Sequence, residues 1–557
     1  MKRREIIKAL TAIPVAGGLM SIEPLIGAGG QKKPGNDAGL LSNPAPGALA
    51  PGPQIYQSIG VEPVINCKGT FTAIGGSLEL PEVRTSVDYA SRNYVFIDEL
   101  AMAVGKRLGE ITGAEWGMVS SGCAAGMKHV TVACITDGDP EKLVRVPDLT
   151  GFTKTEVIAP RYSRNQYDHA IRNAGIKLIT VDTMEELKNA ISPRTALIYL
   201  FSAPQEYDNG PLSVDNVAAV AKEKNIPILV DAAAEVLTIP NIHLKRGVTV
   251  VAYSGGKAIR GPQCAGLLLG KKDILFSAWQ ASSPHHGPGR DNKVGKEEHI
   301  GMLAAVEAWV KRNHPEEEKL WISWLDYISK KVSAVSGVTT KITEPQGVDN
   351  RSARLSITWD PRVLNITGEE VTEDLSNNKP RIVLTGRTNP REGTASISIS
   401  AHMMQPGDEK IVADRIFKLL SQKRDRKIIT VEPPAANLTG NWDVAIEYYS
   451  GRGDHKLFLE KQEGNEIRGT HKSTFSMLDL AGNIDGNKVR LQSYYRENAE
   501  SIPFTFDGLI DGDTFSGVLY LGEYRSANFT AKRTEISPRP VNNITIPSYG
   551  GRKNNSW

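Results

Sequence analysis

A single lysine stands where a buried strand meets a glycine-rich turn. Residues 248–253 form an apolar run typical of a strand buried on both faces, and Ser254-Gly-Gly-Lys257 follows directly. A lysine held there is partly withdrawn from water, which lowers the pKa of its ammonium group and frees the amine to form a Schiff base. Taken alone, such a turn more often carries an exposed surface lysine. Ser254-x-x-Lys257 also matches the nucleophile pattern of penicillin-binding proteins, but the sequence has neither their Ser-Asp-Asn nor their Lys-Thr-Gly element.

Two upstream segments give this lysine a chemical context. Asp231 ends the apolar run 226–230, and a carboxylate at the carboxyl end of a parallel strand points into the ligand crevice. There it can pair with a protonated pyridine nitrogen, although a lone aspartate at this place is more often a helix cap. The small-residue loop Ser120–Gly126 lies between a predicted strand and a predicted helix, where backbone N–H groups can bind a phosphate. The ordered set of loop, carboxylate and lysine indicates a pyridoxal-phosphate enzyme of fold type I.

The elements around these residues follow a βαβ pattern. From Ile55 to about Lys423, short runs rich in Val, Ile and Leu alternate with helical stretches such as Thr183–Ile191 and Ser213–Lys224. This alternation predicts a mainly parallel central sheet with helices on its faces. The runs assigned as strands are 117–120, 143–146, 155–158, 177–181, 196–201, 226–230 and 248–253.

The pattern changes after the Pro433-Pro434 pair. Three segments, at 463–467, 485–489 and 511–515, each place an acidic residue and a glycine before an apolar residue, as in a tight hairpin turn. About 95 residues of this kind predict an antiparallel sandwich or barrel. Gly440-Asn-Trp442 faintly resembles the opening of lipocalin-like barrels, and an ordinary core tryptophan explains it as well.

Composition bounds the function. The 557 residues carry a formal net charge of +3, which gives no global field for nucleic acid, and the four cysteines form neither a CxxC pair nor a disulfide scaffold. No apolar run is long enough for a membrane-spanning helix, so we expect no stable membrane insertion. Arg3-Arg4 before a weakly apolar stretch resembles a twin-arginine export signal, which predicts a periplasmic or exported protein.

These features divide the chain into predicted segments. The predicted order is a signal at 1–30, a linker at 31–54, an N-terminal arm with the cofactor-binding large domain at 55–330, a small α+β domain at 331–423, a linker at 424–435, the β domain at 436–533 and a tail at 534–557.

Residues 55–423 resemble the selenocysteine synthase-like family of fold-type I pyridoxal-phosphate enzymes, in the branch of the D-glucosaminate-6-phosphate ammonia-lyases. The segments that carry the resemblance are 64–70, 75–77, 97–100, 108–114, 120–126, 253–263 and 289–298. The resemblance implies that Lys257 is the Schiff-base lysine and Asp231 the partner of the pyridine nitrogen. It implies phosphate contacts from Ser121, Gly122, Cys123 and Ser254. For an anionic substrate, it implies a basic rim made of Arg260, Gln263, Arg290, Lys293 and Lys296, with Arg84 as a further candidate.

The resemblance also implies a reaction and an assembly. The expected reaction is α-proton abstraction and β-elimination from an anionic amino acid or amino-sugar acid, which gives a 2-keto acid and ammonia. A seryl-tRNA selenium transferase-like activity and a racemase or aminotransferase remain alternatives, although the first needs a basic RNA surface. The predicted strand 395–400 is not followed by the arginine that often binds the α-carboxylate, which leaves the substrate open. We expect at least a homodimer, with residues 66–97 against the partner subunit, and no metal.

Overall fold

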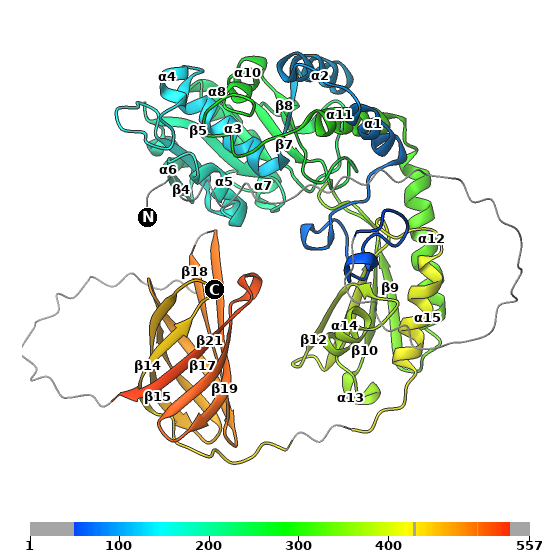
Figure 1. Cartoon of the computed structure of the whole chain (residues 1–557), viewed down its shortest axis with the longest axis vertical. Helices are drawn as coiled ribbons and strands as arrows, with labels where there is room; N and C mark the ends of the chain where they lie inside the picture. The colour runs from blue at the N-terminus through cyan, green and yellow to red at the C-terminus, as the bar shows by residue number, and fades with distance from the viewer. Residues whose placement is uncertain (1–48, 427–429, 498, 535–557) are drawn as a thin grey trace, which may run out of the picture. The chain divides into compact units, whose positions relative to one another are not determined.

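The computed structural model describes residues 49–426, 430–497 and 499–534 (Figure 1). The predicted export signal, most of the first linker and nearly all of the predicted tail therefore lie outside the described residues. The chain divides into two compact units, with the boundary after Pro63. Within the first unit, the described residues contain one 3-10 turn, Gln57–Ile59.

The large domain is built on a seven-stranded sheet with the order β2-β8-β7-β6-β5-β3-β4. Its neighbouring strands pair in parallel except around β8, which runs antiparallel to both β2 and β7. The predicted fold class, a mainly parallel sheet of fold type I, is confirmed. The strands are β2 (Trp116–Ser120), β3 (Glu156–Pro160), β4 (Lys177–Val181), β5 (Thr195–Phe201), β6 (Ile228–Asp231), β7 (Val250–Ser254) and β8 (Gly266–Gly270).

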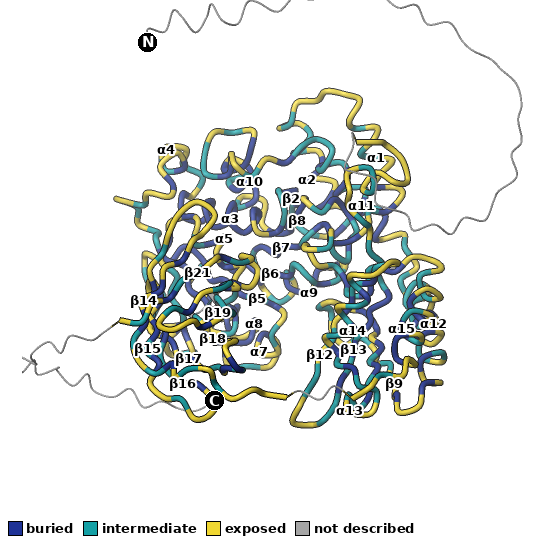
Figure 2. The backbone as a smooth tube through the Cα atoms, turned by 60° about the horizontal axis from the view of Figure 1, so that its bottom comes forward, coloured by how far each residue is buried: buried dark blue, intermediate teal, exposed yellow. Residues whose placement is uncertain are grey.

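Both faces of this sheet are covered. Every residue of β3, β6 and β8 is buried, which explains why these strands have apolar runs without alternation (Figure 2). The long helix α3 packs against β7 and β8. The helices of this part are α1 (Pro81–Ser91), α2 (Ile97–Thr112), α3 (Gly122–Thr136), α4 (Pro140–Leu143), α5 (His169–Arg172), α6 (Met184–Ala190), α7 (Glu206–Asn209), α8 (Val214–Glu223), α9 (Ile242–Lys245), α10 (Lys272–Gln280) and α11 (Lys296–Lys311).

One predicted strand of the large domain is wrong. Residues 143–146 were expected in the sheet. Instead, Leu143 is the last residue of the short helix α4, and residues 144–146 form the turn that follows it. Asp139 starts that helix by accepting a hydrogen bond from the backbone N–H of Glu141 at 2.9 Å, and Pro140 suits the first helical position. Val144 is consequently exposed rather than part of the core.

The small domain is an antiparallel sheet of order β12-β13-β10-β9 with helices packed against it. The arm before the large domain also contributes here, because Ile65 pairs in parallel with Ile382. Helix α12 supplies core residues such as Leu325 and Ile328, so the predicted boundary at 330 falls within a helix of this domain. The elements are β1 (Ile65–Asn66), α12 (His314–Val332), β9 (Val338–Thr343), β10 (Arg354–Trp359), α13 (Pro361–Leu364), α14 (Gly368–Asn377), β11 (Ile382–Val383), β12 (Thr385–Asn389), β13 (Thr394–Ser400) and α15 (Asp408–Leu420).

The C-terminal domain is a closed antiparallel barrel of eight strands, which selects the barrel over the sandwich. The three predicted hairpin turns are present, and their glycines Gly464, Gly486 and Gly512 have φ of 57°, 57° and 55°. Trp442 is buried in the barrel core, and its indole N–H donates to the carbonyl of Leu438 at 2.9 Å. The strands are β14 (Gly440–Glu447), β15 (Arg452–Glu463), β16 (Glu466–Lys472), β17 (Met477–Asp485), β18 (Lys488–Glu497), β19 (Glu500–Asp511), β20 (Thr514–Tyr520) and β21 (Ser526–Thr534).

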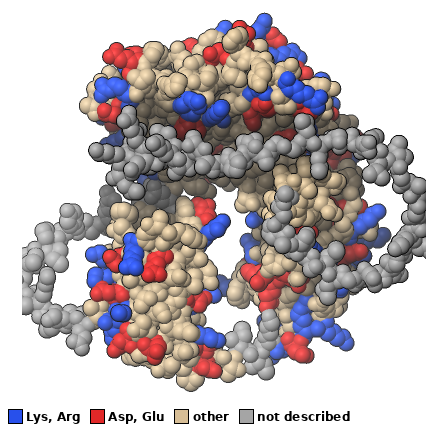
Figure 3. Space-filling model, in the orientation of Figure 1, with Lys and Arg blue, Asp and Glu red and all other residues tan. Residues whose placement is uncertain are grey.

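Acidic and basic side chains are interspersed on the face drawn in Figure 3. In the part of the chain that the structure describes, no helix combines the length and apolar character needed to cross a bilayer.

Candidate active site

Lys257 lines a cavity of about 390 Å³ at the carboxyl end of β7. The strand ends at Ser254, which lines the same cavity, and the chain then turns through two glycines. A Cβ on Gly256 would lie 2.5 Å from the Cα of Gln263, so no side chain fits at that position. The backbone N–H of Ser77 donates to the carbonyl of Gly256 at 2.9 Å. The turn is therefore packed from both sides, which holds Lys257 at the cavity wall.

Asp231, at the end of β6, lines the same cavity and is almost completely buried. Its Oδ1 accepts from the backbone N–H of Ala233 at 3.0 Å and lies 3.6 Å from Cys123 Sγ. Its Oδ2 lies 3.4 Å from the hydroxyl of Tyr199, a β5 residue. Burial raises the pKa of the Asp231 carboxyl above its ordinary value, while hydrogen bonds and Lys257 oppose that rise. A cationic partner would relieve the cost of this buried carboxylate.

The third wall is the start of α3. Gly122 opens the helix with φ of 84°, and Ser121 precedes it at the N-cap position. Gly122 and Cys123 line the cavity, whereas Ser121 does not. A Cβ on Gly266 would lie 2.4 Å from the carbonyl carbon of Gly122, so β8 lies directly behind the turn. The free N–H groups of this helix start are suited to a phosphate.

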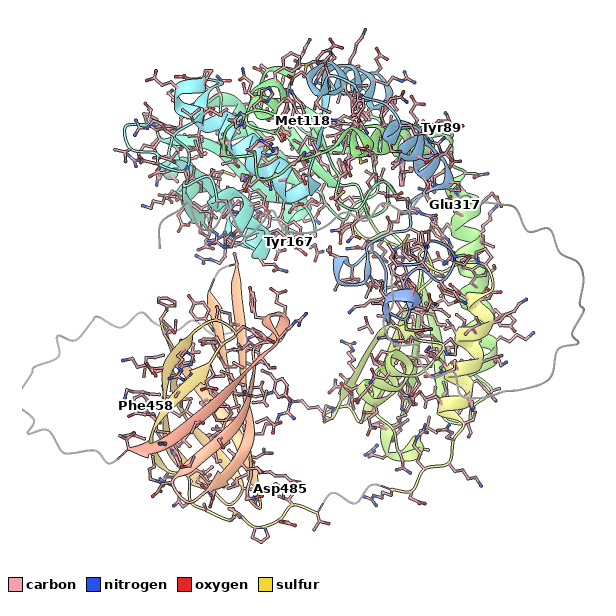
Figure 4. All side chains as sticks on the ribbon, in the orientation of Figure 1. Tyr89, Met118, Tyr167, Glu317, Phe458 and Asp485 are labelled. Carbon is pink, nitrogen blue, oxygen red and sulfur yellow. The ribbon has the colours of Figure 1, made fainter. Side chains whose placement is uncertain are left out.

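Several cavity residues lie outside the segments that carry the resemblance. Thr72 comes from the arm, near Thr70 of the segment 64–70, and Tyr167 comes from the 3-10 turn Gln166–Asp168 (Figure 4). Asp349 and Asn350 come from the loop between β9 and β10. Burial, with the nearby Glu235 carboxylate adding to it, raises the pKa of the Asp349 carboxyl.

The predicted basic rim is divided. Gln263 lines the cavity, and Arg260 lines a second cavity beside it. The remaining four residues do not line the Lys257 cavity of their own chain. Arg84 donates to the carbonyl of Glu79, Arg290 lies 3.4 Å from the Ser283 hydroxyl, Lys293 is exposed and Lys296 pairs with Glu297.

The donor set fits pyridoxal phosphate. The cavity places an amine, a buried carboxylate that forms no ion pair with the described residues and a helix N-terminus with a glycine of positive φ on one set of walls. These are the three groups that the aldehyde, pyridine nitrogen and phosphate of the cofactor require. Among the residues that the structure describes, no group of three or more His, Cys, Asp or Glu side chains could hold a metal ion.

Comparison with known proteins gives the family. The Aminotransferase class-V family matches residues 165–292. D-glucosaminate-6-phosphate ammonia lyase of Salmonella typhimurium (strain 14028s / SGSC 2262) is 30% identical over 305 residues, which are 53% of this chain and 79% of that protein. The chain therefore belongs to the same family as this ammonia lyase, a family of fold-type I pyridoxal-phosphate enzymes.

One solved structure and one further sequence relative match about two thirds of the chain. The solved structure of a D-glucosaminate-6-phosphate ammonia-lyase aligns with a TM-score of 0.59 at 27% identity and covers 66% of this chain and 98% of that one. A 5'-C-glycyluridine monooxygenase-decarboxylase of Streptomyces sp is 25% identical over 382 residues, which are 66% of this chain and 92% of that protein.

When bound, pyridoxal phosphate would supply an electron sink that makes a proton on the Cα of an attached amino compound acidic. Lys257 would hold its aldehyde carbon, Asp231 its pyridine nitrogen, and the start of α3 its phosphate.

Proposed function

We propose that this protein is a lyase that eliminates a β-substituent from an anionic amino acid or amino-sugar acid and releases a 2-keto acid and ammonia. The observation that carries the proposal is the convergence of Lys257, Asp231 and the α3 turn on one cavity. The relationship to a D-glucosaminate-6-phosphate ammonia lyase supports the same reaction type.

Each acidic or basic group of the cavity has a role in this proposal. Lys257 Nζ takes the proton from the substrate Cα. Asp231 remains ionised beside the pyridine nitrogen and keeps that nitrogen protonated. Asp349 is the acid that protonates the leaving hydroxyl oxygen, because it is the second carboxyl group of the cavity and burial favours its protonated form.

The test uses the full chain loaded with pyridoxal phosphate. Amino-sugar acids and β-hydroxy amino acids of both configurations are supplied, and 2-keto acid and ammonia are measured in parallel. The proposal expects both products in equal amounts from at least one substrate, with none from the Lys257→Ala variant. Loss of optical rotation without ammonia would instead identify a racemase. Keto acid that forms only when another 2-keto acid is added to accept the amino group would identify an aminotransferase.

The proposed assembly is a homodimer. The arm and helix α1 expose a series of large apolar side chains, which a single soluble chain rarely leaves in water. The partner subunit would cover them, and the predicted rim residues Arg84, Arg290, Lys293 and Lys296 are then candidates for the partner's cavity. The exposed apolar residues are Phe71, Leu78, Tyr89, Tyr94, Val95 and Phe96.

The proposed localisation is the periplasm or the outside of the cell. Its support is the Arg3-Arg4 pair with the weakly apolar stretch after it. Replacing both arginines by lysines should retain the protein in the cytoplasm. Undiminished recovery outside the cytoplasm would contradict this route.

A further inference from the structure

A second cavity, of about 210 Å³, is lined in part by residues that directly follow residues of the Lys257 cavity along the chain. Ala258 lines the second cavity and follows Lys257 of the first, and Arg351 lines it and follows Asn350 of the first. His402 also lines the second cavity, and its ring lies 3.2 Å from the position of a Cβ on Gly69, the residue before Thr70 of the first cavity. The two cavities are therefore neighbours at the turn after Lys257 and at the loop that carries Asn350.

Three arginines line this second cavity, and two of them are paired with carboxylates. Arg312 makes two hydrogen bonds to Glu317, of 2.9 and 2.8 Å (Glu317 is labelled in Figure 4). Arg351 lies 3.5 Å from Glu318.

Arg260 is the third arginine, and it has no such partner. Its Nε donates to the carbonyl of Leu78 at 2.9 Å, and no carboxylate of the described residues pairs with it. Burial lowers the pKa of its guanidinium, and the nearby cations Arg312 and Arg84 lower it further, whereas the carboxylates of Glu317 and Glu82 act in the opposite direction. The Arg260 guanidinium therefore makes no direct ion pair within the described residues, and its two terminal nitrogens can still donate to an anion.

The backbone of Arg260 is strained. Its φ is 59°, a left-handed conformation that is strained for a residue with a Cβ. The conformation is maintained by hydrogen bonds from Arg260 N to Lys257 O at 3.0 Å and from Leu80 N to Arg260 O at 3.3 Å. Glycine would adopt it without strain, so an arginine at this place points to a use of its side chain.

The other walls suit the acid end of a small organic molecule. Burial lowers the pKa of His402 to about 4, so its ring is neutral near pH 7 and one nitrogen can donate. Within the described part of the chain His402 makes no hydrogen bond, and its Nδ1 is buried without a partner. Trp309 and Trp321 form apolar walls beside it. His402 also stands just after β13, where the sequence lacks an arginine.

We infer that the second cavity is a subsite for an acid group of the substrate, a carboxylate or a phosphate, which is bound by Arg260 and His402. This inference rests on the proposed function, because it describes how the substrate of the Lys257 cavity is recognised. Arg260 supplies two guanidinium N–H groups to the anion, and His402 supplies one ring N–H.

Binding can be measured without turnover. Glutarate and propyl phosphate are titrated into the full-length holoenzyme by calorimetry, with butyramide as the uncharged probe. We expect saturable binding of glutarate or propyl phosphate in the millimolar range and none of butyramide. Arg260→Gln and Arg260→Gly should each weaken this binding at least tenfold. Arg260→Gly also removes the backbone strain, so its loss of binding would not reflect poor folding. Lys311→Gln, at an exposed lysine of α11 outside this cavity, should bind normally.

The outcomes separate the subsite from the reaction. Binding of glutarate alone identifies a carboxylate site, and binding of propyl phosphate alone identifies a phosphate site. Wild-type affinity in both Arg260 variants, or no saturable binding of either anion, overturns the inference. Arg260-dependent binding without keto acid from any substrate would leave the subsite in place and reject the proposed reaction. Release of keto acid together with anion binding that does not depend on Arg260 would support the proposed reaction and reject the subsite.

Discussion

Attachment of the cofactor depends on one amine, that of Lys257. Lys257→Ala should retain the fold, because the turn is formed by its glycines and backbone hydrogen bonds. After borohydride reduction, mass spectrometry of peptides should find the pyridoxyl group on Lys257 in the wild type and on no lysine in the variant. Lys311→Ala, at an exposed lysine of α11 that does not line this cavity, should keep the label. A label on another lysine of the wild type would refute the assignment.

Asp349 can be tested by changing the leaving group. Asp349→Asn should lower kcat on a β-hydroxy amino acid by about 10²-fold or more, because an amide cannot protonate the departing oxygen. On β-chloroalanine, whose chloride leaves without a proton, the loss should be much smaller. For the hydroxy substrate, kcat should fall as pH rises through the raised pKa of Asp349, and Asp349→Asn should remove that limb. Equal losses on both substrates would show that Asp349 only shapes the cavity.

The candidate site could be predicted where local sequence determines position. Lys257, Asp231 and Gly122 each follow or start a regular element, so an apolar run and a glycine are enough to place them at the edge of the sheet. Tyr167 and Asp349 lie on loops whose place depends on tertiary packing, and no period or spacing marks them. Sequence reasoning therefore found the groups that hold the cofactor better than those that surround the substrate.

The same limit applies to whole elements. The alternation of apolar and polar residues, together with the glycine turns, predicted the barrel hairpins. Each of these connections is a short turn that needs one glycine with a positive φ, so local sequence is enough to specify it. Strand β8 was missed, since a short apolar run between two glycines, Gly266 and Gly270, is compatible with a helix or a strand. Its antiparallel direction comes from pairing with β2 and β7, which are distant in sequence.

Arg533 joins the last strand of the barrel to the segment before the first. Its guanidinium carbon lies 4.4 Å from the centre of the Trp442 ring, and its nitrogens donate to Asp513 at 2.7 Å and to the carbonyls of Asn437 and Thr439. Arg533→Gln should lower the stability of the barrel by about 2 kcal/mol, seen in its calorimetric transition. Arg468→Gln, at an exposed residue of β16, should change it little. Equal effects of the two changes would contradict this role.

The barrel should lose stability in acid. His471 is fully buried, its ring nitrogens contact Ser493 Oγ at 2.7 Å and His455 Nδ1 at 2.9 Å, and burial lowers its pKa to about 3. Because the unfolded chain protonates this residue near pH 6.5 and the folded barrel does not, stability falls as pH drops from about 6.5 towards 3. Between pH 7 and pH 5 the loss should be about 1–2 kcal/mol. His471→Gln should flatten this dependence, and an unchanged slope would contradict the assignment.

For the whole molecule, the exposed aromatic residues between α1 and α2 predict the oligomeric state. Tyr94 and Phe96 are among the most exposed large apolar side chains of the described residues. Sedimentation should show a dimer of the full chain, and the double change Tyr94→Lys with Phe96→Lys should shift it to the monomer. Phe475→Lys, at an equally exposed aromatic residue of the barrel, should leave the dimer intact. A wild-type monomer with full activity would contradict both the dimer and a shared site.

Closure of the barrel has a consequence for how such a chain could have been assembled. Strands β14 and β21 pair with each other, so Asn441 and Thr534 are direct neighbours although they stand at opposite ends of the domain sequence. A domain whose entry and exit points adjoin can be joined to a host protein at one surface position without stretching either fold. Barrels of this kind are therefore suited to gene fusion and exchange between unrelated enzymes, as a cassette whose ancestry can differ from that of the catalytic part.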